Sequence, residues 1–141
     1  MLILIPFNTY ALDKDYNDLV YKIVDKEVEE GKINIYFFHK TSCPHCKKEG
    51  KLLDELEKKY DNINIYRFET SSSSVNSNYL KQVKTLFGET SLGVPFTVIG
   101  EKTFLGYNEY VGDEIEKTIQ KYLEENIETE KEKSTFELPV I

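Results

Sequence analysis

The sequence is poor in cysteine, in arginine and in long apolar runs. Two cysteines in 141 residues are too few for the disulfide framework of a small secreted scaffold, and a domain of this size can bury a sufficient core without one. No stretch approaches the roughly 18 apolar residues that a membrane-spanning helix needs. With Arg67 as its single arginine and a net charge of −7, the chain lacks the clustered cations that bind nucleic-acid phosphates, so we expect no nucleic-acid partner.

The remaining composition, 40% hydrophobic and 30% charged, is that of one globular domain with no room for a second core. The apolar start, residues 1–14, is interpreted either as the remnant of a secretory signal or as an edge strand. Residues 128–141 are expected to form a charged C-terminal tail, whose acidic side chains we interpret as a solvated face. The apolar last residues either dock on the domain or lead into further segments of a longer natural protein.

Hydrophobic periodicity predicts four helices and four strands. Helices are expected over residues 15–30, 44–60 and 78–88 and from Asp113 to Ile127, strands over 33–38 and 63–69, and a strand hairpin over 95–106. Gly31 is the expected end of the first helix, and Asp113 with Glu116 forms a capping pattern for the last. This order predicts an α/β fold with a mixed central sheet and helices on both faces.

Both cysteines lie in "TSCPHCKKEG", where the strand over 33–38 gives way to the helix over 44–60. The first turn of a helix presents unpaired N–H groups and the positive end of the helix dipole. A Cys43 thiolate there would accept those hydrogen bonds, so its pKa is expected well below the roughly 8.5 of a free cysteine. Pro44 suits the first helical position, where no N–H is needed.

Cys46 follows one turn later, close enough to form a disulfide yet more shielded. This asymmetry predicts that Cys43 is the attacking and leaving sulfur and Cys46 the resolving one, with His45 adding positive charge nearby. A zinc site is the less favoured alternative, because only His39 and His45 are available as further ligands.

The strand, the C-P-H-C motif at a helix start and the later "GVPF" before a hairpin together resemble the thioredoxin superfamily, over residues 15–127. The resemblance implies a three-layer sandwich and thiol–disulfide oxidoreductase activity without a cofactor. It also implies a cis Val94–Pro95 bond, with Pro95 packed against the active disulfide. The backbone of Val94 would then pair with an extended substrate segment as an added strand does.

The sequence departs from the family at three positions. Phe37 stands where many members carry a buried carboxylate, and Ser42 replaces the usual tryptophan before the first cysteine. The proline that kinks the active-site helix is missing, although Gly50 would permit a bend. The proton acceptor for Cys46 is therefore open. The candidates are water, His39 and Glu49.

The expected partners are protein thiols and disulfides, with an unidentified redox partner such as a bacterial membrane electron carrier. The direction of electron flow stays open, because C-P-H-C occurs in oxidases, reductases and isomerases of the superfamily. Residues 70–92 are too few for the helical insertion of the strongly oxidising periplasmic member. An extracytoplasmic location is favoured over the cytosol. The alternative function is a non-catalytic module that binds extended polypeptide or presents a partner domain.

Overall fold

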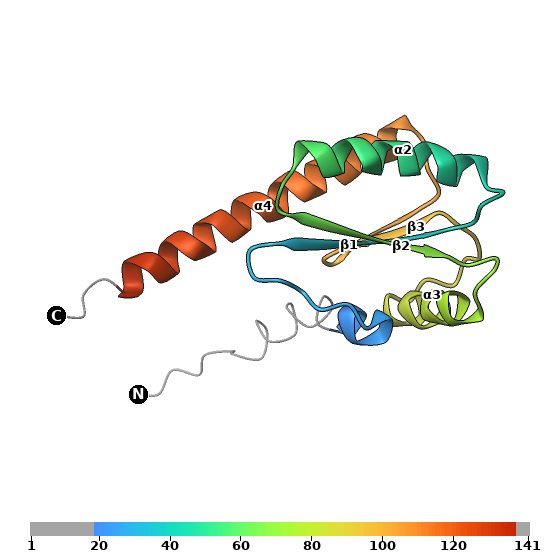
Figure 1. The fold of residues 1–141 in the computed structure, drawn as a ribbon, viewed down its shortest axis with the longest axis horizontal. Coiled ribbons are helices and arrows are strands. Elements are labelled where there is room, and N and C mark those ends of the chain that lie inside the picture. Colours follow the sequence, from blue (N-terminus) through green and yellow to red (C-terminus); the bar gives the residue numbers. More distant parts are fainter. Residues whose placement is uncertain (1–18, 138–141) are drawn as a thin grey trace, which may run out of the picture.

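The computed structural model describes residues 19–137, with side chains described as far as Ile127. The predicted N-terminal segment 1–14, residues 15–18 of the first predicted helix and residues 138–141 lie outside the described residues. After helical residues 19–24, the elements follow in the order shown in Figure 1. They are β1 (Ile33–His39), α2 (Pro44–Lys59), β2 (Ile63–Glu69), α3 (Ser74–Leu86), β3 (Phe96–Ile99), β4 (Lys102–Leu105) and α4 (Glu109–Glu137).

The four strands form one mixed sheet in the order β2-β1-β3-β4. β1 pairs with β2 in parallel, whereas the β1–β3 and β3–β4 pairs are antiparallel. β1 is almost wholly buried because its β-branched and aromatic side chains are covered on both faces. The sequence prediction of a mixed sheet with a strand hairpin is thus confirmed.

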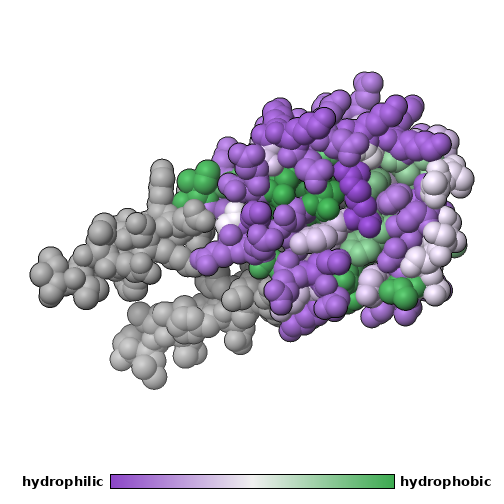
Figure 2. Space-filling view, viewed as in Figure 1, coloured by the Kyte–Doolittle hydropathy of each residue, from purple (hydrophilic) through white to green (hydrophobic). Residues whose placement is uncertain are grey.

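Alternation along β1 divides the core into two clusters. Ile35 and Phe37 pack with α2 and α4, whereas Tyr36 and Phe38 pack with α3 and residues 19–24. Figure 1 shows these helices as layers above and below the sheet. In the same view, Figure 2 shows hydrophilic side chains over both helix layers, with hydrophobic ones between them. The predicted three-layer α/β sandwich is confirmed.

The first helix is shorter than the prediction of residues 15–30. Its described part ends after residue 24, and Asp25 adopts φ 56°. The Lys26 N–H donates to the Tyr21 carbonyl at 3.0 Å, which is the hydrogen bond of a Schellman cap. Gly31, predicted as the helix end, instead adopts φ 79° in the turn before β1. The prediction of this helix end was wrong because Asp25, six residues before Gly31, takes the left-handed position that ends the helix.

Helix α3 begins at Ser74, four positions before the predicted start at residue 78. The Ser73 hydroxyl accepts a hydrogen bond from the Asn76 N–H at 3.1 Å and caps the first turn. The serine run that was predicted to be a loop therefore supplies the N-terminal cap and the first helical residue.

Helix α4 also begins earlier than predicted. Its first residue is Glu109, and the side chain of Asn108 accepts from the Val111 N–H at 2.8 Å. The expected cap, Asp113 with Glu116, lies inside the helix, so that prediction was wrong. α4 continues to Glu137, and residues 128–137, expected as a charged tail, have a helical backbone. No helix in the described part of the chain combines the length and the apolar character needed to cross a membrane.

Candidate active site

The two cysteines lie at the N-terminus of α2, as predicted. Cys43 is the N-cap residue, in an extended conformation, and Pro44 is the first helical residue. The N–H of Cys46 donates to Sγ of Cys43 at 3.2 Å, so the first turn directs a backbone donor at this sulfur. The two sulfurs are joined in a disulfide, with 5.1 Å between the Cα atoms.

The two sulfurs differ in exposure. Cys43 is half-buried beside the exposed Pro44 and His45, whereas Cys46 is only 3% exposed and belongs to the core cluster under α2. This difference follows from the helix, because position 46 turns toward the sheet along with Leu53 and Leu56. A partner arriving from solvent therefore reaches Cys43 and not Cys46.

A cis peptide bond lies against the disulfide. The Val94–Pro95 bond is cis, the isomer that the resemblance implies. The carbonyl oxygen of Val94 lies 3.8 Å from Sγ of Cys43. Pro95 is buried, and its carbonyl accepts from the Gly106 N–H at 2.8 Å, which ties it to the end of β4. The structure thus brings together the predicted site residues Cys43, Val94 and Pro95 from positions far apart in the sequence.

Lys84 holds the segment that leads into Pro95. Its ammonium group donates to the carbonyls of Ser91 at 3.1 Å and Gly93 at 2.7 Å, and it lies 5.3 Å from the centroid of the Phe96 ring. Burial lowers the pKa of Lys84, whose exposed fraction is 7%. Lys84 was not predicted from the sequence, because nothing in the helical pattern around Val83 indicates that a neighbouring lysine turns inward.

A groove of about 500 Å³ borders this segment. Exposed lysines from the loop after β1 and from α3, Lys40 and Lys81, line it together with the buried Lys84. Leu92, which is 94% exposed, and Val94, whose carbonyl oxygen lies 3.8 Å from Sγ of Cys43, also line it. The groove therefore places lysine and apolar side chains beside the segment whose Val94 carbonyl lies near Sγ of Cys43.

Glu69 fastens the loop before Cys43 to the loop after β2. Its carboxylate accepts from the N–H and the hydroxyl of Thr41, both at 2.9 Å, and from the N–H and the hydroxyl of Ser72, both at 2.8 Å. It also accepts from the hydroxyl of Ser71. These hydrogen bonds, that of Ser71 foremost, hold the pKa of Glu69 well below its usual range. The arrangement fixes the approach of the chain to the active-site helix.

Glu49 is buried beneath α2 with an exposed fraction of 0%. The hydroxyl of Thr97 donates to Oε2 of Glu49, and Oε1 has no hydrogen-bond partner among the described residues. Burial raises the pKa of Glu49 to about 7, against the smaller lowering effect of the Thr97 hydrogen bond. Thr97 is paired directly with Phe37 across β1 and β3. A buried carboxylate of α2 thus lies beside the strand pair formed by Phe37 and Thr97.

His39, another sequence candidate for proton transfer, lies at the end of β1. Its ring stacks on Phe37 with the centroids 5.0 Å apart, and burial lowers its pKa. A cavity of about 410 Å³ that Cys46 borders is also lined by His39 and Arg67. The cavity gives water access to Cys46, and His39 borders the same space without a hydrogen bond to Cys46 among the described residues.

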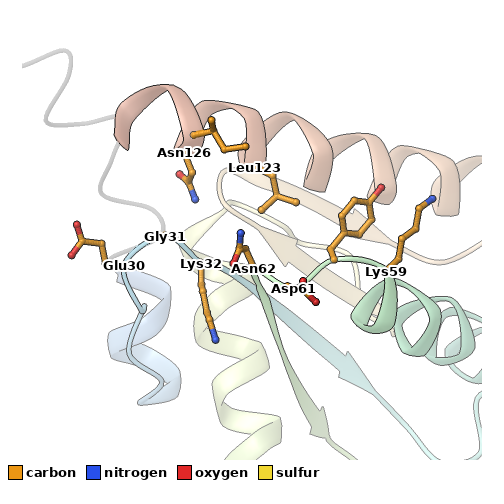
Figure 3. Close-up of a pocket in the computed structure, with 10 residues that line it drawn as sticks. Glu30, Gly31, Lys32, Lys59, Asp61, Asn62, Leu123 and Asn126 are labelled. Carbon is orange, nitrogen blue, oxygen red and sulfur yellow. The ribbon is translucent and has the colours of Figure 1, made fainter. Parts of the chain in front are cut away.

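A further cavity of about 410 Å³ lies between the start of β1, the end of α2 and helix α4 (Figure 3). Charges of both signs line it, from Glu30, Lys32, Lys59 and Asp61, and no predicted site residue does. Among the described residues, no group of three or more His, Cys, Asp or Glu side chains could hold a metal ion.

No protein-family model matches the sequence, and no curated protein does. Solved structures do match. Thioredoxin O2 from Arabidopsis thaliana in its oxidised state is 15% identical, with a TM-score of 0.52 over 76% of this chain and 88% of that one. The chain has the thioredoxin fold. Oxidised thioredoxin O1 from the same plant gives a TM-score of 0.51 at 15% identity over 72% of this chain and 86% of that one.

A glutaredoxin from Archaeoglobus fulgidus is 26% identical over 57% of this chain and 82% of its own length, with a TM-score of 0.42. Within the thioredoxin fold, the C-P-H-C pair of this chain lies at the start of α2 and beside a cis proline. A sulfur that receives a helix N–H, next to a shielded second sulfur, has the arrangement needed for disulfide exchange.

Proposed function

We propose that this protein is a thiol–disulfide oxidoreductase that exchanges its Cys43–Cys46 dithiol or disulfide with protein substrates. The observation that carries the proposal is the position of Sγ of Cys43, which accepts the Cys46 N–H and lies 3.8 Å from the Val94 carbonyl. The thioredoxin fold and the cysteine pair support the reaction class.

In the reducing direction, the Cys43 thiolate attacks a substrate disulfide. One substrate sulfur leaves as a thiolate and takes a proton from solvent, while the other remains bonded to Cys43. Cys46 then loses its proton and attacks Sγ of Cys43, which forms the intramolecular disulfide and releases the second substrate thiol. Two electrons pass to the substrate, and oxidation of a dithiol is the same sequence reversed. The N–H of Cys46 and the dipole of α2 favour the ionised Cys43 at the start of each cycle.

The substrate segment would lie in extended form along the backbone of Val94, beside the lysine-lined groove. Because Lys40 and Lys81 are exposed there, we propose that substrates with an acidic residue close to the reacting cysteine are favoured. Val94 and Leu92 would contact the apolar part of the same segment.

The direct test is catalysed reduction of insulin disulfides by dithiothreitol. The wild-type protein should accelerate the reaction, and Cys43→Ser should abolish the acceleration. No acceleration by the folded, reduced wild type would contradict the proposal. Undiminished binding of an extended peptide to Cys43→Ser in that case would support a non-catalytic binding module instead.

The direction of electron flow follows from the reduction potential. A value near the roughly −270 mV of thioredoxin would make the protein a donor of electrons, and one near about −120 mV would make it an acceptor. Equilibration with glutathione buffers, followed by alkylation of free thiols, measures this potential. The potential also indicates whether the redox partner must reduce or oxidise the cysteine pair after each cycle.

A further inference from the structure

Glu49 is unusual because it is a fully buried carboxylate without a cationic partner. It is the only fully buried acidic side chain in the described part of the chain, and no ion pair of Glu49 occurs there. An unpaired buried carboxylate with one unsatisfied oxygen is costly, and an apolar side chain of similar volume is generally better tolerated. Stability therefore gives no reason for Glu49, which indicates a role in chemistry.

The helix directs Glu49 toward Cys46. The two residues are three positions apart on the buried face of α2, a spacing at which Cβ atoms are about 5–6 Å apart. Long helical side chains lean toward the N-terminus and over the preceding turn, which here contains Cys46. The hydrogen bond from Thr97 holds Oε2, and Thr97 is only two residues from Pro95. The free oxygen, Oε1, is therefore held at the active-site end of the core.

We propose that Glu49 is the proton acceptor that activates the Cys46 thiol when Cys46 resolves the mixed disulfide on Cys43. This inference rests on the proposed function, since it concerns the second step of the same exchange.

The step conserves protons and electrons. The Cys46 thiol transfers its proton to the Glu49 carboxylate, and the Cys46 thiolate attacks Sγ of Cys43. The Cys43–Cys46 bond forms, the bond from Cys43 to the substrate breaks, and the substrate sulfur leaves with the electron pair. Glu49 then gives the proton to that thiolate or to solvent. In the reverse direction, protonated Glu49 returns the proton to Cys46 as the intramolecular disulfide opens.

The surroundings of Glu49 suit a group that titrates near neutrality. Its pKa of about 7 lies between that of an ordinary carboxyl group and the roughly 8.5 of a free thiol. Phe37 and Thr97, which are paired across β1 and β3, carry no charge. The one cation on the neighbouring strand, Arg67, is paired with Phe37 from β2, and its guanidinium group bonds to Asp54. The titratable or charged groups that line the cavity beside Cys46 are His39, Lys40, Lys47, Lys51, Asp54 and Arg67. Besides Glu49, the charges of Glu109, Asp113 and Glu55 act on Tyr107.

Tyr107, from the loop between β4 and α4, lies close enough to Glu49 for the carboxylate charge to act on it. Burial is the main reason that its pKa is raised, and the charge of Glu49 is the second. Of the remaining groups, His39 is the rival proton acceptor, because it borders the same cavity as Cys46.

A single turnover with dithiobis-nitrobenzoate separates the two steps. Reduced protein releases a first equivalent of coloured thionitrobenzoate when Cys43 attacks the reagent, and a second when Cys46 resolves the mixed disulfide. The rate of the second release, measured by stopped-flow absorbance from acid to alkaline pH, reports ionisation of Cys46. In the wild type it should rise through an inflection near pH 7, where Glu49 ionises.

Glu49→Gln should leave the first release unchanged, slow the second at least about tenfold at neutral pH, and remove the inflection. Glu55→Gln removes an exposed carboxylate from the same helix and should leave both releases as in the wild type. His39→Gln should do the same. Thr97→Val removes the hydrogen bond that favours ionised Glu49, so it should move the inflection to higher pH, which a purely structural role would not do.

A second release that keeps its rate and pH profile in Glu49→Gln would overturn the assignment, while the proposed function would stand. Loss of the inflection in His39→Gln would assign the role to His39 instead. If Glu49→Gln does not fold, an inflection that Thr97→Val leaves in place would overturn the assignment. Absence of the second release from the wild type would overturn the proposed function itself.

Discussion

The hydroxyl of Thr97 on β3 donates a hydrogen bond to the carboxylate of Glu49 on α2, and both side chains are fully buried. The contact joins the strand that follows Pro95 to the helix that carries both cysteines. A titratable group therefore lies in the core between the two segments that form the active site. Its ionisation affects the stability of the protein as well as its chemistry.

The oxidised protein should lose stability as the pH rises from about 4.5 to about 7. Glu49 has a pKa of about 7 in the folded state against an ordinary value of 4.5, so the folded state retains a proton that the unfolded state loses in this interval. The contribution of this group to the free energy of unfolding should fall by about 3 kcal/mol across it. Urea unfolding at a series of pH values measures the change.

The matched control is Glu49→Gln, which cannot ionise and should show a much flatter profile over the same interval. A wild-type protein whose unfolding free energy follows that of Glu49→Gln at every pH would show that Glu49 ionises normally in the folded state.

Cys46→Ser should accumulate a mixed disulfide through Cys43. The exposed sulfur can still attack a substrate, but the buried position no longer holds a thiolate that could release it. Non-reducing electrophoresis and mass spectrometry of the trapped complex identify the bonded cysteine. Cys43→Ser is the control and should trap nothing, because Cys46 is only 3% exposed. Trapping by Cys43→Ser and not by Cys46→Ser would reverse the assigned roles.

Lys84→Met should weaken substrate binding more than it slows the chemical step. The substitution keeps the apolar stem but removes the hydrogen bonds to the carbonyls of Ser91 and Gly93, so the segment before Pro95 loses its anchor. The expected result is a KM for a disulfide peptide raised several-fold, with kcat changed less. Lys81 is an exposed lysine of the same groove, so Lys81→Met tests whether loss of positive charge alone raises the KM. Equal KM changes in both variants would argue against anchoring.

Glu69→Gln should loosen the loop before Cys43. An amide cannot accept all the hydrogen bonds that Thr41 and Ser72 donate to the carboxylate, so amide hydrogen exchange at these two residues should accelerate. The lowered pKa gives this contact a defined pH dependence. Its stabilising effect is present above the ordinary pKa of 4.5 and is lost as the pH falls through the lower folded-state value. Amide exchange rates that the substitution leaves unchanged would show that Glu69 does not hold the loop before Cys43 in place.

Short sequence patterns correctly predicted the start of the active-site helix and the hairpin turn. The C-P-H-C motif between a strand and an amphipathic helix predicted an N-capping Cys43 and an inward-facing Cys46, and both are found. The turn at Gly100 likewise follows from the hairpin signal around it. Each of these depends on a few consecutive residues, which a sequence displays directly.

The contacts that the sequence could not predict join distant segments or depend on a local choice between similar caps. The residues around Glu49 do not indicate that its partner is Thr97, 48 positions away. The residues around Lys84 do not indicate that its side chain turns inward. The start of α4 was misplaced because Asn108 and Asp113 are both acceptable caps by residue type. Only the packed structure decides between them.

The difference in exposure between the two sulfurs has one more consequence. In the proposed exchange, partners in solvent cannot reach Cys46, so resolution of a mixed disulfide by Cys46 depends on groups inside the domain. A tightly bound substrate and a weakly bound one would be released by the same buried step. The surface of the protein would then affect only which substrate forms the mixed disulfide.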